Sequence, residues 1–463
     1  MTPRSAILRS LTLVSALAVA GAVSLNTSSA APSGFRDVMW VGNNWDGTAT
    51  IVDERSLKVL KTGVNLIPDK KQELQDIYLA PDRLAFYLAV QQGPGEGHDQ
   101  YVDDMFTTRD GKHLAVSRPS FGDVVWIDIT KVTTTGGVES VVREQQMDGY
   151  RTDHMGLSPD GRRLIVSDST NKQVIEYSMV DETLPNGTQL KMGDRLRTFP
   201  SGETPHENNY SKDGKRIFHA SIGRVYTPGD STTLGPIKLG PVHDAIKGDR
   251  WMQIVNNSDF SIAHRWEMGK ELAEAGHPDM SAAVRPMALS PDERFLYFQV
   301  SFYHGIIEFD TQAPDSNGKV DYKAGGIPEP RVGAVKRLMP LPNRVPNMPL
   351  EQYVNDSAHH GLAMNKAGTT LCAAGTMDDY VALVDRKTAT PKFFDTTTTG
   401  HDYAKPYWST EGLNDTCWIS LSETDSLAVL SFKTKKELAY LPVGNHPQRV
   451  RHGLVPKAVV ATW

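Results

Sequence analysis

The stretch "DHMGLSPDGRRLIVSDSTNKQVIEYSM" (153–179) holds the pattern that decides the fold. At its centre, Pro159 presets the first inner position of a tight turn and Gly161 accepts a positive φ. On both sides of this turn, apolar and polar residues alternate with the period of two that is typical of β-strands. A polar loop after Asp168 leads to a further strand at 173–179. The stretch therefore predicts three successive antiparallel strands.

The same plan returns along the chain at intervals of roughly 40 to 80 residues. Repeats at such intervals are typical of arrays and propellers, in which each repeat is one small sheet that must pack against its neighbours. The turn glycine is replaced by Glu293 in one copy and by Asp415 in another. The copies besides 153–179 lie at 103–129, 206–222, 285–310, 360–385 and 407–432.

The two ends of the repeat region complete one another. Residues 37–63 contain two strands but no hairpin before them, and "GNHPQRVRHGLVP" (444–456) supplies a lone first strand. Pairing these segments would remove two exposed sheet edges. Six internal copies and one split copy predict an all-β fold, a seven-bladed β-propeller closed by pairing of the C-terminal strand with the N-terminal blade.

Two segments carry a family resemblance. "SPDGRRLIVSDSTNKQVIEYS" (158–178) and "GNHPQRV" (444–450) resemble the repeats of YVTN/YncE-like seven-bladed β-propellers, and the likeness extends over about 36–463. The resemblance implies the fold but no particular activity, because this architecture hosts binding proteins, lactonases, lyases and metalloenzymes. The Gly- and Pro-rich segments at 224–250 and 328–353 break the pattern and are predicted to be surface excursions, not blade strands.

The first thirty residues predict a secretory signal peptide. Arg4 and Arg9 precede a short apolar run at 11–23, and small residues end the segment at Ser28 and Ala30. The run is shorter than the roughly 20 apolar residues of a membrane-spanning helix. We expect cleavage after Ala30, a single propeller domain at 31–463, and a secreted or periplasmic location.

The composition limits the classes of partner that the protein is expected to bind. The net charge is −6 and no Lys/Arg run is present, which argues against nucleic-acid binding. No other apolar stretch is long enough for a transmembrane segment. We expect a monomer whose partner is a small molecule or an extracellular protein. Cys372 and Cys417 fall on second strands of adjacent copies, and they either pair as a disulfide or remain buried thiols.

Residues just ahead of the innermost strands should meet around the propeller axis, because each blade presents the same position there. Counting back from the turns gives Asp103, Asp153, His206, Arg285, His360 and Tyr407, with neighbours Asp104, His154, Glu207, His359 and Trp408. His446 holds the comparable place in the C-terminal strand. Loops between second and third strands open on the same face and add His304, Asp378 and Asp379.

This ring leaves two functions open. In the first, a secreted binding or scaffold protein holds a small ligand in a wet pocket. In the second, a metal- or His-dependent enzyme of lactonase or lyase type uses the same mouth. A divalent transition metal would suit grouped imidazoles, but each imidazole could equally bond its own backbone. The ligand-binding candidates are Arg285, Tyr407, Trp408, His304 and Asp104. The metal candidates are His154, His206, His360 and His446. The catalytic candidates are His206, Glu207, Arg285 and Asp103.

Overall fold

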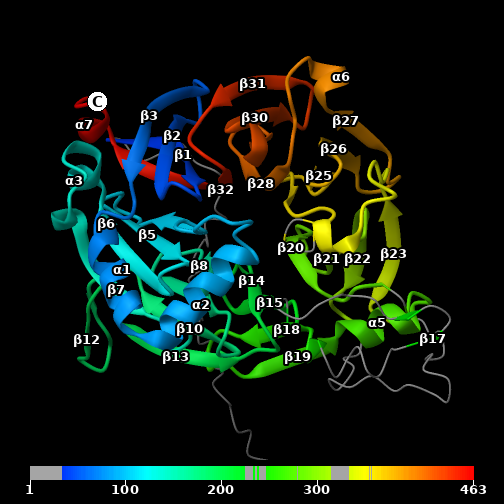
Figure 1. Ribbon diagram of the computed structural model, residues 1–463, viewed down its shortest axis with the longest axis horizontal. Helices are drawn as coiled ribbons and strands as arrows, with labels where there is room; N and C mark the ends of the chain where they lie inside the picture. Colours follow the sequence, from blue (N-terminus) through cyan, green and yellow to red (C-terminus); the bar gives the residue numbers. More distant parts are fainter. Residues whose placement is uncertain are drawn as a thin grey trace, which may run out of the picture. The chain divides into compact units, whose positions relative to one another are not determined.

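The computed structural model describes residues 34–224, 247–278, 280–313, 333–353, 355 and 357–463, together with two short strands at 233–234 and 237–238 (Figure 1). The predicted signal peptide at 1–30 lies outside these residues. Residues 31–463 form one compact unit. Within it, seven four-stranded antiparallel sheets surround a common axis. The predicted seven-bladed propeller is confirmed.

The first three blades hold the following strands. Blade 1 consists of β1 (Phe35–Asn43), β2 (Thr48–Asp53), β3 (Lys58–Asn65) and β32 (Pro447–Pro456). Blade 2 consists of β4 (Met105–Thr107), β5 (His113–Arg118), β6 (Asp123–Asp128) and β7 (Val141–Gln146). Blade 3 consists of β8 (Thr152–Leu157), β9 (Arg163–Asp168), β10 (Gln173–Ser178) and β13 (Arg195–Pro200).

The other four blades follow in chain order. Blade 4 has β14 (Pro205–Tyr210), β15 (Arg216–Ser221), β18 (Trp251–Asn256) and β19 (Ile262–Glu267). Blade 5 has β20 (Val284–Leu289), β21 (Phe295–Val300), β22 (Gly305–Asp310) and β23 (Val335–Pro340). Blade 6 has β24 (Leu362–Met364), β25 (Thr370–Gly375), β26 (Tyr380–Asp385) and β27 (Pro391–Phe394). Blade 7 has β28 (Pro406–Gly412), β29 (Thr416–Leu421), β30 (Ser426–Ser431) and β31 (Glu437–Pro442).

Short elements lie between strands of one blade, between successive blades or after the last strand. The helices are α1 (Lys70–Leu79), α2 (Pro81–Gln92), α3 (Ile129–Thr134), α5 (Met268–Glu274), α6 (Thr396–Thr399) and α7 (Lys457–Val460). Two hairpins add β11 (Glu182–Thr183) with β12 (Gln189–Leu190), and β16 (Thr233–Leu234) with β17 (Ile237–Lys238). None of the helices among the described residues is long and apolar enough to span a membrane.

The ring closes through its two ends, as the sequence predicts. Strand β32 pairs antiparallel with β1, and the register sets Trp40 opposite Arg451 and Phe35 opposite Pro456. Strand β32 thus becomes the innermost strand of blade 1. The closure leaves no unpaired inner edge on β1, the kind of edge that promotes aggregation.

The tight turns between first and second strands share one backbone conformation. Gly161 has a φ of 69°, and Glu293 and Asp415 adopt φ values of 58° and 59° at the equivalent places. A non-glycine residue is disfavoured in this left-handed region. In Glu293 the side chain is anchored, since its carboxylate accepts a bond from the backbone N–H of Lys212 at 2.6 Å and pairs with Arg216 at 2.8 Å.

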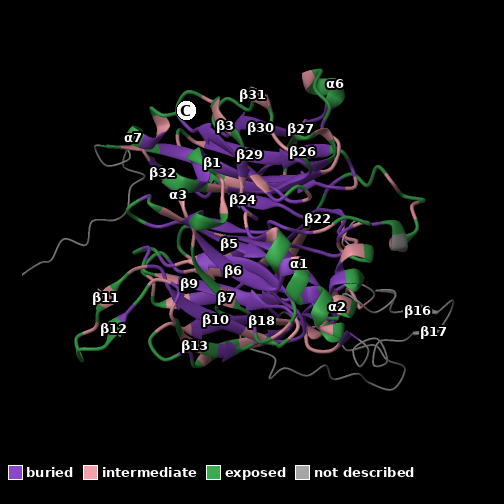
Figure 2. Ribbon diagram, turned by 60° about the vertical axis from the view of Figure 1, so that its left-hand side comes forward, coloured by how far each residue is buried: buried purple, intermediate pink, exposed green. Residues whose placement is uncertain are grey.

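Apolar side chains from neighbouring blades share common cores. The strands of the blades consist largely of buried residues (Figure 2). Between blades 6 and 7, for example, Val381 and Leu383 belong to the same buried cluster as Ile419 and Leu430. Cys372 on β25 and Cys417 on β29 are disulfide-bonded within this cluster. Of the two states left open by the sequence, the disulfide is the one observed.

The prediction that 328–353 lies outside the blades is wrong in part. Residues 335–340 form β23, the outermost strand of blade 5. Val335 and Met339 are buried on its inward face, and Pro340 is tolerated because it ends an outer strand. In the segment 224–250, most residues lie outside the described ranges, and β16 pairs with β17 as a separate two-stranded hairpin.

A helical hairpin, not predicted from the sequence, joins blades 1 and 2. Pro81 occupies the first turn of α2, where its missing N–H costs no hydrogen bond. The loop after α2 reaches blade 7, because Glu96 forms an ion pair with Lys405 at 3.0 Å. In the same loop, His98 stacks on Trp45 with ring centroids 3.8 Å apart. These contacts hold the helical insertion on the propeller.

Candidate metal centre

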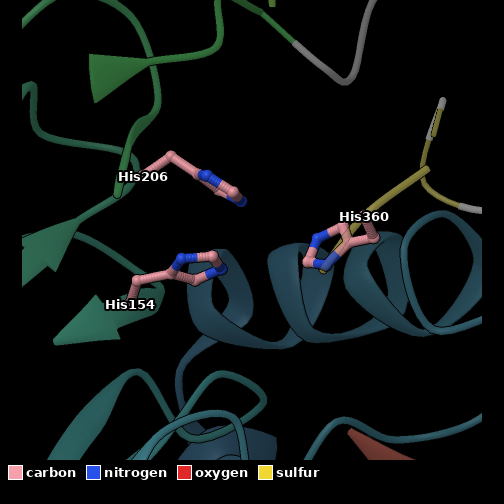
Figure 3. Close-up of side chains that lie close together, drawn as sticks. All are labelled: His154, His206 and His360. Atoms are coloured by element: carbon pink, nitrogen blue, oxygen red, sulfur yellow. The ribbon is translucent and has the colours of Figure 1, made fainter. Parts of the chain in front are cut away.

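Three histidines from different blades meet at the propeller axis (Figure 3). His154 lies in β8, His206 lies in β14, and His360 lies just before β24. One ring nitrogen from each lies within 4.8 Å of the others, and all three side chains are buried. A helix of the α1–α2 hairpin passes behind them in this view. Three residues that lie 52 to 206 positions apart in sequence thus form one compact group.

Irregular strand pairing explains how these side chains reach the axis. The β8–β9 ladder shifts register between Thr152 and Met155, and the β14–β15 ladder shifts between Pro205 and Glu207. Such a bulge re-aims the side chains that it contains. His154 and His206 lie inside these two shifts. Equivalent shifts enclose Arg285 in blade 5, and Tyr407 with Trp408 in blade 7.

A carboxylate orients the first of the three rings. Glu207 Oε2 lies 2.6 Å from Nδ1 of His154, and its Oε1 accepts a bond from Asn209 at 3.0 Å. Nε2, the other ring nitrogen of His154, lies 3.4 Å from Oδ1 of Asp153 and is the one that a metal could bind. A carboxylate behind a ligating histidine fixes the tautomer and raises the basicity of the ligand. Burial raises the pKa of Glu207 to about 7, against the influence of Arg451 and Arg449.

The histidines are held neutral, which is the form that binds metals. Burial lowers the pKa of His154, His206 and His360 well below the ordinary value, and nearby arginine charges add to the effect. The Nδ1 atoms of His206 and His360 are buried without a hydrogen-bond partner among the described residues. Buried polar atoms are seldom left unsatisfied, so these two nitrogens are candidates for contact with a ligand.

Positive charge lines the same region. Arg449 on β32 lies over the ring of Trp408 at 3.9 Å and pairs with Asp103 at 3.2 Å. Its Nε and Nη1 atoms are buried with no partner among the described residues. Arg285 donates to the hydroxyl of Ser301 at 2.6 Å. The buried guanidinium of Arg449, with its two unused donors, is a ready binding group for a carboxylate or another oxyanion.

Acidic and aromatic groups complete the site. Burial raises the pKa of Asp103 to about 7, although Arg449 opposes this shift. Asp103 and Asp153 each offer an oxygen within 4.8 Å of a nitrogen of His154. The ring of Tyr407 stacks on His360 at 4.2 Å, and its hydroxyl accepts a bond from Asn355 at 3.0 Å. The axis therefore combines potential metal ligands, acids, cations and aromatic rings.

The structure does not place every predicted ring residue here. His446 does not join the three histidines, because its ring stacks on Trp45 at 3.7 Å and its backbone turns away with a φ of 52°. The carboxylate of Asp104 is occupied by Arg451, with two bonds of 2.7 Å, and does not face a ligand. His304 lies in a separate cluster with His359 and Asp378. Asp379 accepts a bond from the backbone of Lys405 at 3.0 Å.

Arg449, a buried cation of the site, was not among the residues predicted from the sequence. In blade 1 the ladder between β1 and β32 shifts between Val41 and Asn43, and the irregular part of β32 contains Arg449. This is the position that corresponds to the bulged residues of the other blades. The residue predicted for this position in the C-terminal strand was His446, which lies three residues before Arg449.

Comparisons with known proteins support the fold. No protein-family model matches the chain, and no curated protein matches it by sequence. Among solved structures, the hydrazine synthase of Kuenenia stuttgartiensis matches with a TM-score of 0.51 and 13% identity, over 85% of this chain and 92% of that one. The virginiamycin B lyase of Staphylococcus aureus, in a selenomethionine-substituted crystal, matches with a TM-score of 0.45 and 9% identity, over 73% and 83% of the chains. At such identity the first likeness shows the fold alone, and the second carries no argument.

Proposed function

We propose that this protein is a metal-binding propeller that takes up a small anionic molecule at its axis. In this proposal His154, His206 and His360 hold one divalent transition metal. The convergence of their ring nitrogens within 4.8 Å carries the proposal. Neutral imidazoles are common ligands of zinc, copper, iron and nickel. The carboxylate of Glu207, 2.6 Å from His154 Nδ1, would hold the first ligand in position.

The anion would lie between the metal and Arg449. Three protein ligands leave at least one coordination position for a small molecule, as in catalytic zinc sites. The unused Nε–H and Nη1–H donors of Arg449 are buried, and a bound oxyanion would satisfy them. The stacked rings of Tyr407 and His360 would offer a flat surface to its organic part.

Catalysis at this site is a second candidate, favoured by the position of Asp103. Its carboxylate lies beside His154 and 3.2 Å from Arg449. An acid in that place could exchange a proton with a molecule that the metal and the arginine hold, as a lactonase or a lyase requires. Turnover of a panel of lactones by the metal-loaded protein and by Asp103→Asn would test this role. Turnover that survives the substitution at the wild-type rate would remove Asp103 from the reaction.

Several wider expectations remain proposals. We infer membership of the YVTN/YncE-like propellers, export through a signal peptide cleaved after Ala30, and a monomeric state. The repeat at 158–178 and the composition of the first thirty residues support them. Mass spectrometry of the mature N-terminus after expression in a bacterial host, with light scattering of the purified protein, would test export and oligomeric state.

Metal analysis tests the central proposal. The untagged protein should lose one equivalent of bound metal when His206 and His360 are both replaced by alanine, with the thermal unfolding midpoint of the metal-free form little changed. The matched control is His264→Ala with His401→Ala, two exposed histidines away from the axis. It should retain the full metal content. Equal metal in the axial variant and in the wild type would refute the site.

The anion is tested separately by calorimetric titration of the metal-loaded protein with malonate. Arg449→Met should weaken binding about 10-fold or more, because charge-assisted hydrogen bonds contribute about 1.5–3 kcal/mol, and it should leave the metal content unchanged. Arg195→Met serves as the control, since Arg195 forms an exposed ion pair with Asp148. If both variants bind malonate as the wild type does, Arg449 is not the anion-binding group.

A further inference from the structure

A second group of metal-binding side chains lies between blades 5 and 6. His304 directly precedes β22, His359 lies before β24, and Asp378 lies in the turn between β25 and β26. Oδ2 of Asp378 lies 2.6 Å from Nδ1 of His304 and 2.8 Å from Nε2 of His359. Three potential ligand atoms from three separate chain segments thus converge on one small region.

The surroundings hold each of these groups in place. Oδ1 of Asp378 accepts a bond from the backbone N–H of Arg344 at 2.6 Å. Nε2 of His304 lies 3.0 Å from the hydroxyl of Tyr353. The hydroxyl of Tyr380 lies 3.1 Å from Nε2 of His359. In each case the partner belongs to a residue other than the three potential ligands. Such partners resemble the outer shell of a metal site, which orients the ligands.

The charge balance of the cluster favours a cation. Asp378 is only 1% exposed. Among the described residues, its carboxylate has ion-pair contacts with His304 and His359 and with no lysine or arginine side chain. A buried carboxylate without a full counter-charge is costly. A divalent ion would supply that charge.

We propose that His304, His359 and Asp378 form a second binding site for a divalent first-row transition metal. Two imidazoles and one carboxylate are the ligand set of open mononuclear sites, such as those of non-haem iron proteins. The hydroxyl of Tyr380 donates to the backbone carbonyl of Pro342 at 3.0 Å, which fixes its position beside His359. The site has no ligand in common with the axial histidines.

The alternative is a hydrogen-bond network without a metal, in which both imidazoles donate to Oδ2 of Asp378. The distances alone allow it. The two arrangements differ in one measurable property, because only the first takes up a metal ion. The number of ions bound by suitable variants therefore decides between them, and it does so independently of the axial site.

Cobalt(II) is the probe, since its visible absorption reports the ligand field and its content can be counted by mass spectrometry. Chelator-treated protein is titrated with Co²⁺, passed over a desalting column and analysed. The wild type should retain two equivalents. His206→Ala with His360→Ala should retain one, and His304→Ala with Asp378→Asn should also retain one. The combined variant should retain none.

The outcomes separate the two proposals. If the His206/His360 variant retains no cobalt, the second site does not exist. If the His304/Asp378 variant retains none while the His206/His360 variant retains one, the second site stands and the axial proposal fails. The His206/His360 variant leaves the second cluster intact. It therefore remains decisive even if replacing His304 and Asp378 prevents folding.

Discussion

His359 and His360 follow one another in the chain, but their imidazoles enter different clusters. His359 lies 2.8 Å from the carboxylate of Asp378, whereas the ring of His360 lies 6.0 Å from that of His206 at the axis. Successive side chains of an extended chain point in opposite directions. One short segment before β24 therefore contributes to both candidate metal sites.

Gly361, the next residue, should be sensitive to any side chain. A Cβ there would lie 2.5 Å from the backbone nitrogen of Ser409 and 2.6 Å from the backbone of Trp408, both in blade 7. Gly361→Ala should therefore displace the His359–His360 segment and weaken metal binding at both clusters. Cobalt titration and thermal unfolding measure the effect.

Gly93 offers the control for this substitution. A Cβ at Gly93 would meet only the carbonyl oxygen of Ala89, at 3.1 Å. Gly93→Ala should leave both metal affinities unchanged. If Gly361→Ala binds cobalt as tightly as the wild type, the close packing of blades 6 and 7 does not fix the geometry of the sites.

Replacing Glu207 should weaken the axial metal without unfolding the protein. Glu207→Gln keeps the shape of the side chain but removes the negative charge behind His154. Loss of such an outer partner typically costs 10- to 100-fold in metal affinity. Competition with a chromophoric chelator measures the change. Glu437→Gln is the control, because Glu437 contacts the exposed His401 at 2.7 Å, away from the axis. Equal losses in the two variants would contradict the role of Glu207.

Removal of the closing strand should make the protein aggregate. Deletion of 444–463 takes away β32, so that β1 becomes an exposed edge and Arg449 is lost. Size-exclusion chromatography with light scattering should show multimers. Deletion of 457–463 alone removes α7 but keeps β32 and should leave a monomer. If the longer deletion stays monomeric with an unchanged melting curve, strand closure does not stabilise the ring.

Glu73 should make stability depend on pH. Burial in α1 raises its pKa to about 8, and the nearby carboxylates of Asp123 and Glu144 add to the shift. The folded protein therefore keeps a proton that the unfolded chain has lost above its ordinary pKa of 4.5. Stability should fall as the pH rises from that value to about 8, and stay level above it.

Glu73→Gln should remove this pH dependence of the free energy of unfolding. For one proton the free energy changes by at most about 1.4 kcal/mol per pH unit. Guanidinium unfolding at several pH values measures it, with Glu139→Gln as an exposed control. A variant whose stability falls with pH as steeply as the wild type does would show that Glu73 is not the group responsible.

Much of the fold could be predicted because short patterns of neighbouring residues specify its turns and strands. The turn at Pro159–Gly161 and the alternation on both sides of it require only neighbouring residues to form. The helical hairpin at 70–92 was missed because it has no counterpart in the other repeats. Strand β23 was not predicted, because it lies in a proline-rich segment and its alternation of apolar and polar residues is short.

The candidate site was predicted in part. His154, His206 and His360 were correctly grouped, since equivalent positions of a closed ring must meet at its axis. His446 lies apart from these three and Arg449 lies among the axial residues, because a bulge in β32 shifts the strand by a few residues. A residue count cannot register such a shift.

The number of blades, their turns and the closure of the ring could all be predicted from the chain's periodicity and its two complementary ends. Which side chains meet became visible only in the folded chain. His359 and His360 take different sides, Glu207 lies behind His154, and Arg449 reaches Asp103. Such contacts depend on bulges, on side-chain direction and on the approach of distant segments, and these are properties of the packed chain.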